Sequence, residues 1–431
     1  MIDRKKRAWF ALLDAKFIRE NAETVRQSLV NRKYDISVLE KFLELDKRWR
    51  TLTEEGNSLR KKRNEVSEQI PKLPKDQKQT MISEMKGIAD RIRQIEAETK
   101  KIDVDRDELL LNMPNVPDPS VPVGALDEGD EFLRSWGNKR EFDFKPLNHW
   151  EIGERLDIID FERGVKITGT GFYVLKGDGA RLERALINFM LDLHHTQGYK
   201  ELFPPVVINR KSCVGTGQLP KMQEDMYWIE RDDLYLNPTA EVPVTNLYAD
   251  EILDRRQLPI YHTAYLPSFR REAGKHIETK GIARVHQFNK VELVKFVLPE
   301  TSQQELETLL NDAEAVVQGL KLPYRIRLLC TGSLGFHSSK TYDIETHAPG
   351  MDQWLEVSSC SDFKEFQARR AMIKFRREPH LKSDYIHTLN GSGIALPRTM
   401  VSVLENYQKK DGTVEIPDVL RPYMKGQETI G

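Results

Sequence analysis

The stretch 389–408 reads LNGSGIALPRTMVSVLENYQ and decides the fold that we expect for this chain. Gly391, Gly393 and Ala395 recur at the two-residue period of a β-strand, so one strand face would be almost bare and a flat ligand could lie against its backbone. Pro397 can open a helix at its first position and would place Arg398 in the first turn. The sequence therefore predicts a strand that leads directly into a helix.

The opposite face of this strand would carry two polar side chains, Asn390 and Ser392. A bare backbone, two polar groups and an arginine at a helix start suit a nucleotide bound beside a small polar partner. A glycine-rich strand end packed in a core is the alternative, and this stretch alone leaves both interpretations open.

Composition limits the class of protein. The 431 residues are 39% hydrophobic and 31% charged, which suggests two or three domains with a heavily charged surface. A formal net charge of −1 argues against a general nucleic-acid coat but not against a local basic patch. The three cysteines are far apart and form no CxxC pair, so we expect a reducing compartment without disulfides or structural zinc. No apolar run reaches 18 residues, and a cytoplasmic protein is expected.

Residues 36–112 carry a heptad pattern on both sides of a turn. Hydrophobic positions step by four and three over 45–70 and again over 81–109, with PKLP at 71–74 between them. This 3.5-residue repeat predicts an antiparallel coiled-coil hairpin about 50 Å long. Four seam positions are not hydrophobic: Gly56, Arg63, Thr99 and Arg106.

The turn end of the hairpin is basic. Residues 60–78 hold seven basic and three acidic side chains, a local net charge of +4. An extended basic probe suits contacts with phosphates, whereas a solvated charged helix face is the alternative. The candidate contact residues are Arg60, Lys61, Lys62, Arg63, Lys72 and Lys75.

A proline-rich segment, 113–147, predicts a linker or irregular wrap between an N-terminal domain (1–112) and a catalytic domain (148–431). In that last domain, strands and helices do not alternate as βαβ units, so we expect an α+β fold with an antiparallel sheet flanked by helices. The expected strands are 234–237, 261–271, 282–295, 324–329, 341–346 and 353–360, and the expected helices are 181–198, 240–253, 302–320, 364–377 and 398–408.

Two of these strands could present charged and aromatic groups to one ligand. Arg270 and Glu272 share one strand face, and Phe288, Lys290 and Glu292 share another. Arginine can grip phosphate oxygens with two parallel hydrogen bonds, and phenylalanine can stack on a base. Cross-strand salt bridges on a solvated face are the alternative.

Two shorter motifs add polar groups. Thr239 and Glu241, if extended, would point the same way and could bind an ammonium group, although a helix start capped by Thr239 is the alternative. The stretch 353–361 offers Glu356 and hydroxyl groups suited to Mg²⁺.

Together these residues resemble the class II aminoacyl-tRNA synthetases, and among them the seryl-tRNA synthetase family. The resemblance covers nearly the whole chain from about Leu13, and the hairpin precedes the other motifs as it does in that family. The motifs stand in the family's order: 215–220 (GTGQLP), 239–241 (TAE), 269–272 (FRRE), 285–288 (VHQF), 356–361 (EVSSCS), 366–370 (FQARR), 389–393 (LNGSG) and 419–424 (VLRPYM).

The resemblance implies a homodimer that activates L-serine with ATP and Mg²⁺, without zinc, and then transfers serine to the 3′ end of tRNA(Ser), with tRNA(Sec) as a second candidate acceptor. It implies that the arm reaches the long variable arm of the tRNA. Charge grows on phosphate oxygens in such a reaction, so fixed cations rather than a nucleophilic side chain are needed.

The resemblance also implies site residues. Arg270 would grip the α-phosphate, Arg398 the γ-phosphate, and Phe288 would stack on adenine; with Glu356, the two arginines form the catalytic set. The implied ATP-binding residues are Arg270, Arg271, Glu272, Val285, His286, Gln287, Phe288, Glu356, Val357, Ser358, Ser359 and Arg398. The implied serine-binding residues are Thr239, Ala240, Glu241, Arg270, Glu292, Asn390 and Ser392.

Glu356 and Ser359 are the implied Mg²⁺ ligands. A flat strand would not put residues three apart on one face, so we predict a bulge or turn between them. The loop 273–281 departs from the family because it is about one residue shorter and lacks the usual Gly-Arg-Asp pattern. This loop is expected to touch the acceptor end of the tRNA.

Two other functions fit parts of this pattern. One is a ligase of the same fold that loads a small amino acid onto a carrier protein, although such relatives lack the long arm. The other is a catalytically silent dimer that uses its arm to bind RNA or protein. The presence of both motif arginines and of all the implied serine and Mg²⁺ residues argues against the silent dimer.

Overall fold

The computed structural model describes residues 13–72, 74–273 and 281–431, with the side chains of 72, 75 and 76 also left out. The chain divides into two compact units, residues 1–114 and 115–431, and each is described here by itself.

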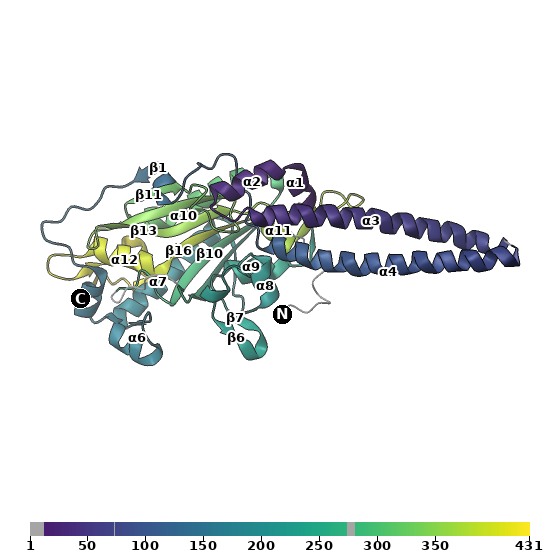
Figure 1. Cartoon of the computed structure of the whole chain (residues 1–431). Helices are drawn as coiled ribbons and strands as arrows, with labels where there is room; N and C mark the ends of the chain where they lie inside the picture. Colours follow the sequence, from purple (N-terminus) through teal and green to yellow (C-terminus); the bar gives the residue numbers. More distant parts are fainter. Residues whose placement is uncertain (1–12, 73, 274–280) are drawn as a thin grey trace. The chain divides into compact units, whose positions relative to one another are not determined.

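Unit 1 is a helical hairpin with two short helices before it. Helices α1 (Ala15–Glu20) and α2 (Ala22–Asn31) lead into the long helices α3 (Ser37–Gln69) and α4 (Lys75–Leu111). Figure 1 shows α3 and α4 lying side by side along their length. Their seam buries Leu52, Ile95 and Ile102, with Leu45, Trp49 and Leu59 packed around them. The predicted antiparallel hairpin is confirmed.

The polar seam positions are accommodated in different ways. The Arg106 guanidinium lies 4.6 Å from the ring centroid of Trp49 and donates to Asp46 Oδ1 at 2.6 Å. The Thr99 hydroxyl donates to the Ile95 carbonyl one turn back in its own helix, at 2.8 Å. Thr99 and the Arg106 Nη atoms therefore have partners, and the seam continues past both residues.

Unit 2 is built on an eight-stranded sheet with the order β1-β11-β12-β13-β16-β10-β9-β4. All neighbouring pairs are antiparallel except β4 with β9, so the expected α+β fold is confirmed. The strands are β1 (Glu131–Trp136), β4 (Lys200–Leu202), β9 (Ile260–Phe269), β10 (Gln287–Val297), β11 (Tyr324–Leu328), β12 (Lys340–Ala348), β13 (Gln353–Asp362) and β16 (His387–Ala395).

Three helices cover the sheet and bury its main core: α7 (Gly177–Thr196), α10 (Ser302–Gly319) and α12 (Leu396–Tyr407). The shorter helices are α5 (His149–Arg155), α6 (Phe161–Thr168), α8 (Arg210–Gly215), α9 (Glu241–Thr245) and α11 (Phe366–Ala371). Small strands pair outside the main sheet: β2 (Ile159–Asp160), β3 (Val174–Leu175), β5 (Val207–Asn209), β6 (Trp228–Ile229), β7 (Leu234–Leu236), β8 (Ile252–Asp254), β14 (Lys374–Arg376), β15 (Asp384–Tyr385), β17 (Val414–Glu415) and β18 (Thr429–Ile430).

Two helix predictions were too long. The helix expected over 240–253 ends at Thr245 and is followed by a short turn and strand β8. The helix expected over 364–377 ends at Ala371 because Met372 adopts a left-handed backbone with φ +58°, and strand β14 follows. These segments pair with each other, Lys374 opposite Ile252, so sheet pairing replaced helix continuation.

The proline-rich segment contains a short 3-10 helix, Asp127–Gly129, and one strand. Strand β1 pairs antiparallel with β11 and forms one edge of the large sheet.

Among the described residues, no helix is both long enough and apolar enough to span a membrane.

Candidate functional site

The junction of β16 and α12 lines one side of the site. The predicted strand–helix connection is confirmed. The glycine face of the strand packs inward: a Cβ on Gly391 would lie 3.1 Å from Leu309 Cδ1 of α10, and one on Gly393 would lie 2.7 Å from His194 Nε2 of α7. The prediction that a flat ligand lies against this bare face was wrong, because covering helices already occupy it.

A bulge turns the end of β16 toward the cleft. Glu292 pairs with Ser392 and Val291 pairs with Ile394, which leaves Gly393 as the additional residue. Ile394 has φ +132°, an uncommon backbone region for a β-branched residue, and such strain is concentrated at functional sites. As a result Ser392 and Ala395, three residues apart, both line the same cleft.

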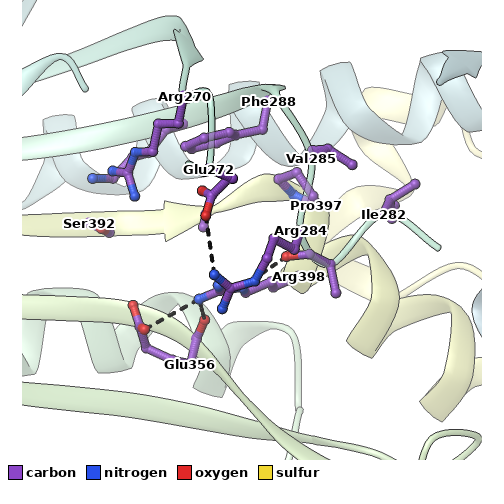
Figure 2. Close-up of a pocket in the computed structure, with 13 residues that line it drawn as sticks. Arg270, Glu272, Ile282, Arg284, Val285, Phe288, Glu356, Ser392, Pro397 and Arg398 are labelled. Carbon is purple, nitrogen blue, oxygen red and sulfur yellow. Dashed lines mark hydrogen bonds and ion pairs between the residues drawn. The ribbon is translucent and has the colours of Figure 1, made fainter. Parts of the chain in front are cut away.

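The first part of the cleft is lined by arginine and aromatic side chains (Figure 2). The Arg270 guanidinium lies 5.2 Å from the ring centroid of Phe288, and its Nε donates to the Pro238 carbonyl at 3.3 Å. Arg284, which the sequence analysis did not single out, donates to Glu272 Oε2 at 3.1 Å. A cation–π contact and an ion pair therefore fix two arginines that face one space.

Arg398 reaches the same space from the first turn of α12. Its Nε donates to the Ala283 carbonyl at 3.2 Å, and its Nη1 donates to the Glu356 carbonyl at 2.8 Å. The Glu356 carboxylate lies 3.3 Å from the same Nη1 (Figure 2). Three arginines thus converge on this part of the cleft, a charge arrangement suited to a polyphosphate.

The segment 285–288 does not follow strand alternation, because β10 begins only at Gln287. Val285 and Phe288 line the cleft. His286 instead bonds the Arg270 carbonyl through Nδ1 at 3.0 Å and its ring lies beside Phe172. Gln287 is exposed and, with Phe172, lines a separate small pocket. His286 can therefore support Arg270, but its side chain does not line the first part of the cleft.

Glu356 and Ser359 lie on one side of β13. Asp343 pairs with Ser359, but Glu345 pairs with Glu356, so one additional residue is inserted in β13. The predicted bulge between Glu356 and Ser359 is confirmed, and both side chains line the second part of the cleft. Asp343, which the sequence analysis missed, lines it too; burial, and then the Glu356 charge, raise the pKa of its carboxyl.

Four of the implied residues face elsewhere. Val357 and Ala240 are buried in hydrophobic clusters, and the Ser358 hydroxyl donates to the Ser392 carbonyl at 2.6 Å. Arg271 is exposed, and its backbone N–H donates to the Asp225 carbonyl at 2.8 Å.

The second part of the cleft holds a buried charged cluster. The Thr239 hydroxyl donates to Glu292 Oε2 at 2.5 Å and accepts from Lys290 Nζ at 3.1 Å. Lys290 is also ion-paired with Glu292 at 2.5 Å. The alternative in which Thr239 caps a helix was wrong, since Ala240 holds that position and the Thr239 side chain turns to Glu292.

Asn390 joins two carboxylates in this cluster. Its amide donates to Glu292 Oε1 at 2.9 Å and to Glu241 Oε2 at 3.1 Å. Gln367 donates to the other Glu241 oxygen at 2.5 Å. Burial, and then the nearby Glu292 charge, raise the pKa of Glu241 to about 7. An ammonium group that entered here would favour the ionised form of Glu241.

In the buried charged cluster, sequence reasoning did not assign Lys290 and Gln367 to the site. Lys290 shares strand parity with Phe288 and Glu292, which was a usable signal. Gln367 is the second residue of α11, 126 positions from Glu241, and no local pattern connects the two.

In unit 1, the candidate phosphate contacts lie near the turn. Arg60 is ion-paired with Glu96 at 3.0 Å, and Lys61 with Glu65 at 3.9 Å. Lys62 is exposed and Arg63 is half-buried. The side chains of Lys72 and Lys75 lie outside the described residues, as does most of the loop 273–281.

Comparisons with known proteins agree with this geometry. Residues 12–117 match the model of the seryl-tRNA synthetase N-terminal domain, and residues 227–407 match the class II tRNA synthetase core domain of the G, H, P, S and T enzymes. The chain is 52% identical to the serine–tRNA ligase of Methanosarcina barkeri over 97% of this chain and 99% of that protein. It is also 52% identical to the enzyme of Geobacter sulfurreducens over 97% of this chain and all of that protein.

Solved structures resemble it over the same length. The seryl-tRNA synthetase of Pyrococcus horikoshii complexed with ATP has a TM-score of 0.93 at 37% identity and covers 97% of this chain and 99% of its own. The cytoplasmic serine–tRNA ligase of Naegleria fowleri in complex with AMP has a TM-score of 0.89 at 29% identity, covering 98% and 99%.

Proposed function

This chain belongs to the seryl-tRNA synthetase family and is a serine–tRNA ligase, and from that premise we propose how its cleft performs the reaction. Serine lies in the buried charged cluster, and ATP lies among the three arginines. The observation that carries the proposal is that both parts of the cleft share Arg270, Lys290, Glu356 and Ser392. Two ligands placed there would meet at Arg270.

The nucleotide part supplies fixed positive charge. Arg270 holds the α-phosphate, Arg398 holds the γ-phosphate, and Phe288 stacks on adenine with Val285 completing the wall. The serine carboxylate then attacks the α-phosphorus in line, the bond to the bridging oxygen breaks, and pyrophosphate leaves. The arginines stabilise charge on the phosphate oxygens, and holding the two reactants together lowers the entropic cost of the encounter.

The serine part supplies carboxylates and hydrogen-bonding groups. Glu292, Glu241 and Thr239 receive the ammonium group, and Asn390 and Ser392 lie where the serine hydroxyl can be paired. Alanine would leave these buried polar groups unsatisfied, and rejection by about 10⁴-fold is typical of such a site. Arg398 must exchange its bond to Glu356 for the phosphate when ATP enters.

The residues on β13 fit a hard divalent cation bound together with ATP. Glu356 and Ser359 face the cleft together because of the bulge, and oxygen ligands with phosphate are what Mg²⁺ prefers. We propose that they hold Mg²⁺, which would neutralise phosphate charge.

We further propose a homodimer and a tRNA-binding arm. Strand β4 forms an edge of the large sheet, and the adjoining Phe203 is 79% exposed, so a second copy can cover this edge. In the N-terminal domain, the basic residues near the turn of the arm contact tRNA phosphates without reading bases. The acceptor is tRNA(Ser), with tRNA(Sec) as a candidate to be tested in the same assay.

The first experiment is ATP–pyrophosphate exchange with each of the twenty amino acids, in the absence of tRNA. We expect exchange with serine alone, and loss of this exchange in an R270A/R398A double variant. A matched double variant of the arm, K62A/R63A, keeps exchange but charges tRNA(Ser) more slowly. Exchange with another amino acid, or full activity in R270A/R398A, contradicts the assignment.

A second assay on the same protein distinguishes a carrier-protein ligase from a tRNA ligase. After activation, radiolabelled serine is offered tRNA(Ser), tRNA(Sec) and an acyl-carrier-type protein in parallel. We expect label on tRNA(Ser), and label on the protein alone would favour the carrier ligase.

A further inference from the structure

A buried histidine outside the cleft connects helix α12 to the wall of the nucleotide part. His149 begins α5, and both it and Glu405 of α12 have fully buried side chains. The His149 Nδ1 atom lies 2.9 Å from Glu405 Oε1, and the backbone N–H of Ile282 donates to His149 Nε2 at 3.1 Å. The ring therefore touches α12 on one side and the cleft wall on the other.

These contacts fix the protonation of the ring. Because Ile282 donates to it, Nε2 must carry a lone pair, and a neutral imidazole then has its proton on Nδ1, where it donates to Glu405. Glu405 Oε1 also accepts the backbone N–H of His149 at 2.9 Å, while Oε2 accepts those of Gly350 at 2.8 Å and Met351 at 3.1 Å. A carboxylate with four N–H donors is a fixed acceptor, so the ring orientation is fixed too.

The cleft wall that bonds His149 also accepts a hydrogen bond from Arg398. Ile282 and Ala283 line the nucleotide part, and the Ala283 carbonyl accepts Arg398 Nε at 3.2 Å. Arg398 and Glu405 are seven residues apart in α12, two turns, and so lie on one helix face. Helix α12 is therefore bonded to two adjacent wall residues. Arg398 bonds Ala283 directly, and Glu405 is connected to Ile282 through His149.

We infer that His149 is a positioning residue for ATP binding: through Ile282 it sets the wall against which Arg398 is aligned. The inference rests on the proposed placement of ATP in this part of the cleft. Without the Nε2 acceptor, the buried Ile282 N–H would lose its partner and the segment 282–284 would shift, and Arg398 with it. The serine cluster shares no hydrogen bond with His149 among the described residues, so serine binding is expected to be independent.

Two substitutions separate positioning from general stability. In H149N the amide occupies the Nδ1 position and can still donate to Glu405, but Ile282 N–H has no acceptor. In H149Q the side-chain oxygen can reach the Nε2 position and accept from Ile282, but the bond to Glu405 is lost. Serine-dependent ATP–pyrophosphate exchange on the full-length protein gives KM for ATP, KM for serine and kcat for each, beside thermal unfolding.

We expect H149N to raise KM for ATP about tenfold with KM for serine within about twofold, and H149Q to stay closer to the unsubstituted protein in KM for ATP while unfolding at a lower temperature. H347N is the matched control. His347 is buried and its carbonyl accepts Asn406 Nδ2 of α12 at 2.8 Å, but its ring pairs with Asp352 rather than with the wall.

The inference is overturned if folded H149N has an unchanged KM for ATP, or if H149N, H149Q and H347N all change KM for ATP and unfolding temperature in parallel. The R270A/R398A variant distinguishes the two proposals. If that variant keeps exchange, the placement of ATP is wrong; if it loses exchange and H149N behaves normally, only the role of His149 is wrong.

Discussion

Each unit has a buried charge cluster, and the two clusters differ in their ratio of positive side chains to carboxylates. In the arm, the Asp46 carboxylate is 1% exposed and is paired with Arg106 at 2.6 Å, Arg19 at 3.1 Å and Arg50 at 3.2 Å. In the cleft, Asn390 joins two buried carboxylates, Glu241 and Glu292, and Lys290 is ion-paired with Glu292, while the Arg270 charge and His337 Nε2, at 3.9 Å, act on Glu241. The arm cluster places three arginines around one carboxylate, whereas the cleft cluster has a single ion-paired lysine for two carboxylates.

This difference is the one we expect between a cluster that stabilises the fold and a cluster that we propose to bind a ligand. Asp46 is surrounded by arginine side chains that bond its carboxylate, so the arm cluster is complete without a ligand. Burial and the Glu292 charge, by contrast, raise the pKa of Glu241 to about 7, which means that its ionised form is unfavourable until another cation arrives. Perturbed pKa values concentrate at functional sites for this reason. In the placement that we propose, the serine ammonium group is this additional cation.

The largest expected effect is on the arm. D46N leaves three arginines around a neutral amide, and loss of one partner from a buried ion cluster costs about 3–5 kcal/mol. Hydrogen exchange of the amides of α3 and α4 should accelerate accordingly, while serine-dependent pyrophosphate exchange stays unchanged.

D103N is the matched control for the arm. Asp103 also pairs with Arg106, at 3.3 Å, but is half-exposed, and such pairs contribute about 0–1 kcal/mol. Equal amide exchange in D46N and D103N would mean that the Asp46 cluster is not what stabilises the arm.

The next effect concerns the cleft cluster. E292Q keeps the shape of the side chain but removes the charge that faces the ammonium group, so kcat/KM for serine should fall about a hundredfold, ~3 kcal/mol. Steady-state exchange at saturating ATP measures it, with thermal unfolding in parallel because Lys290 loses its carboxylate. E183Q is the control: Glu183 is a buried carboxylate bonded by Asn289 at 3.0 Å, outside the cleft. Comparable losses in the two variants would remove Glu292 from the serine site.

The smallest effect is on pH dependence. The pKa of Glu241 lies above its ordinary value, so this carboxyl is protonated in the free protein below about pH 7 and serine must displace the proton. KM for serine should therefore rise about tenfold from pH 8 to pH 6, and E241Q should abolish this slope. For stability the sign is opposite: between pH 4.5 and about 7 the folded state holds a proton that the unfolded state releases, so Glu241 lowers stability as pH rises through this window.

The carboxyl of Glu183 provides a control for this pH experiment. Burial alone raises the pKa of its carboxyl to about 7, although it lies outside the cleft. Its substitution should alter the pH dependence of unfolding but leave the pH dependence of KM for serine unchanged. A KM slope that persists in E241Q and disappears in E183Q would reverse the assignment.

Much of the fold followed from local patterns. The heptad repeats predicted α3 and α4, the two-residue period predicted β16, and the proline with the arginine predicted the start of α12. The need for a bulge between Glu356 and Ser359 followed from strand parity together with the shared role that the family resemblance implied for the two residues. Most of the individual site roles came instead from the ordered motifs of the family resemblance.

The sequence by itself determined these elements because their signals lie in adjacent residues: a period of 3.5 or 2 is complete within one helix or strand. Only the tertiary structure decided that Gly391 and Gly393 face covering helices, that Lys290 lies between Thr239 and Glu292, and that His149 bonds Ile282. These contacts join residues up to 199 positions apart (Gly393 and His194), and sheet register, bulges and burial throughout the unit set them. No local pattern contains that information, because the favourable energy exists only once the separate strands are packed together.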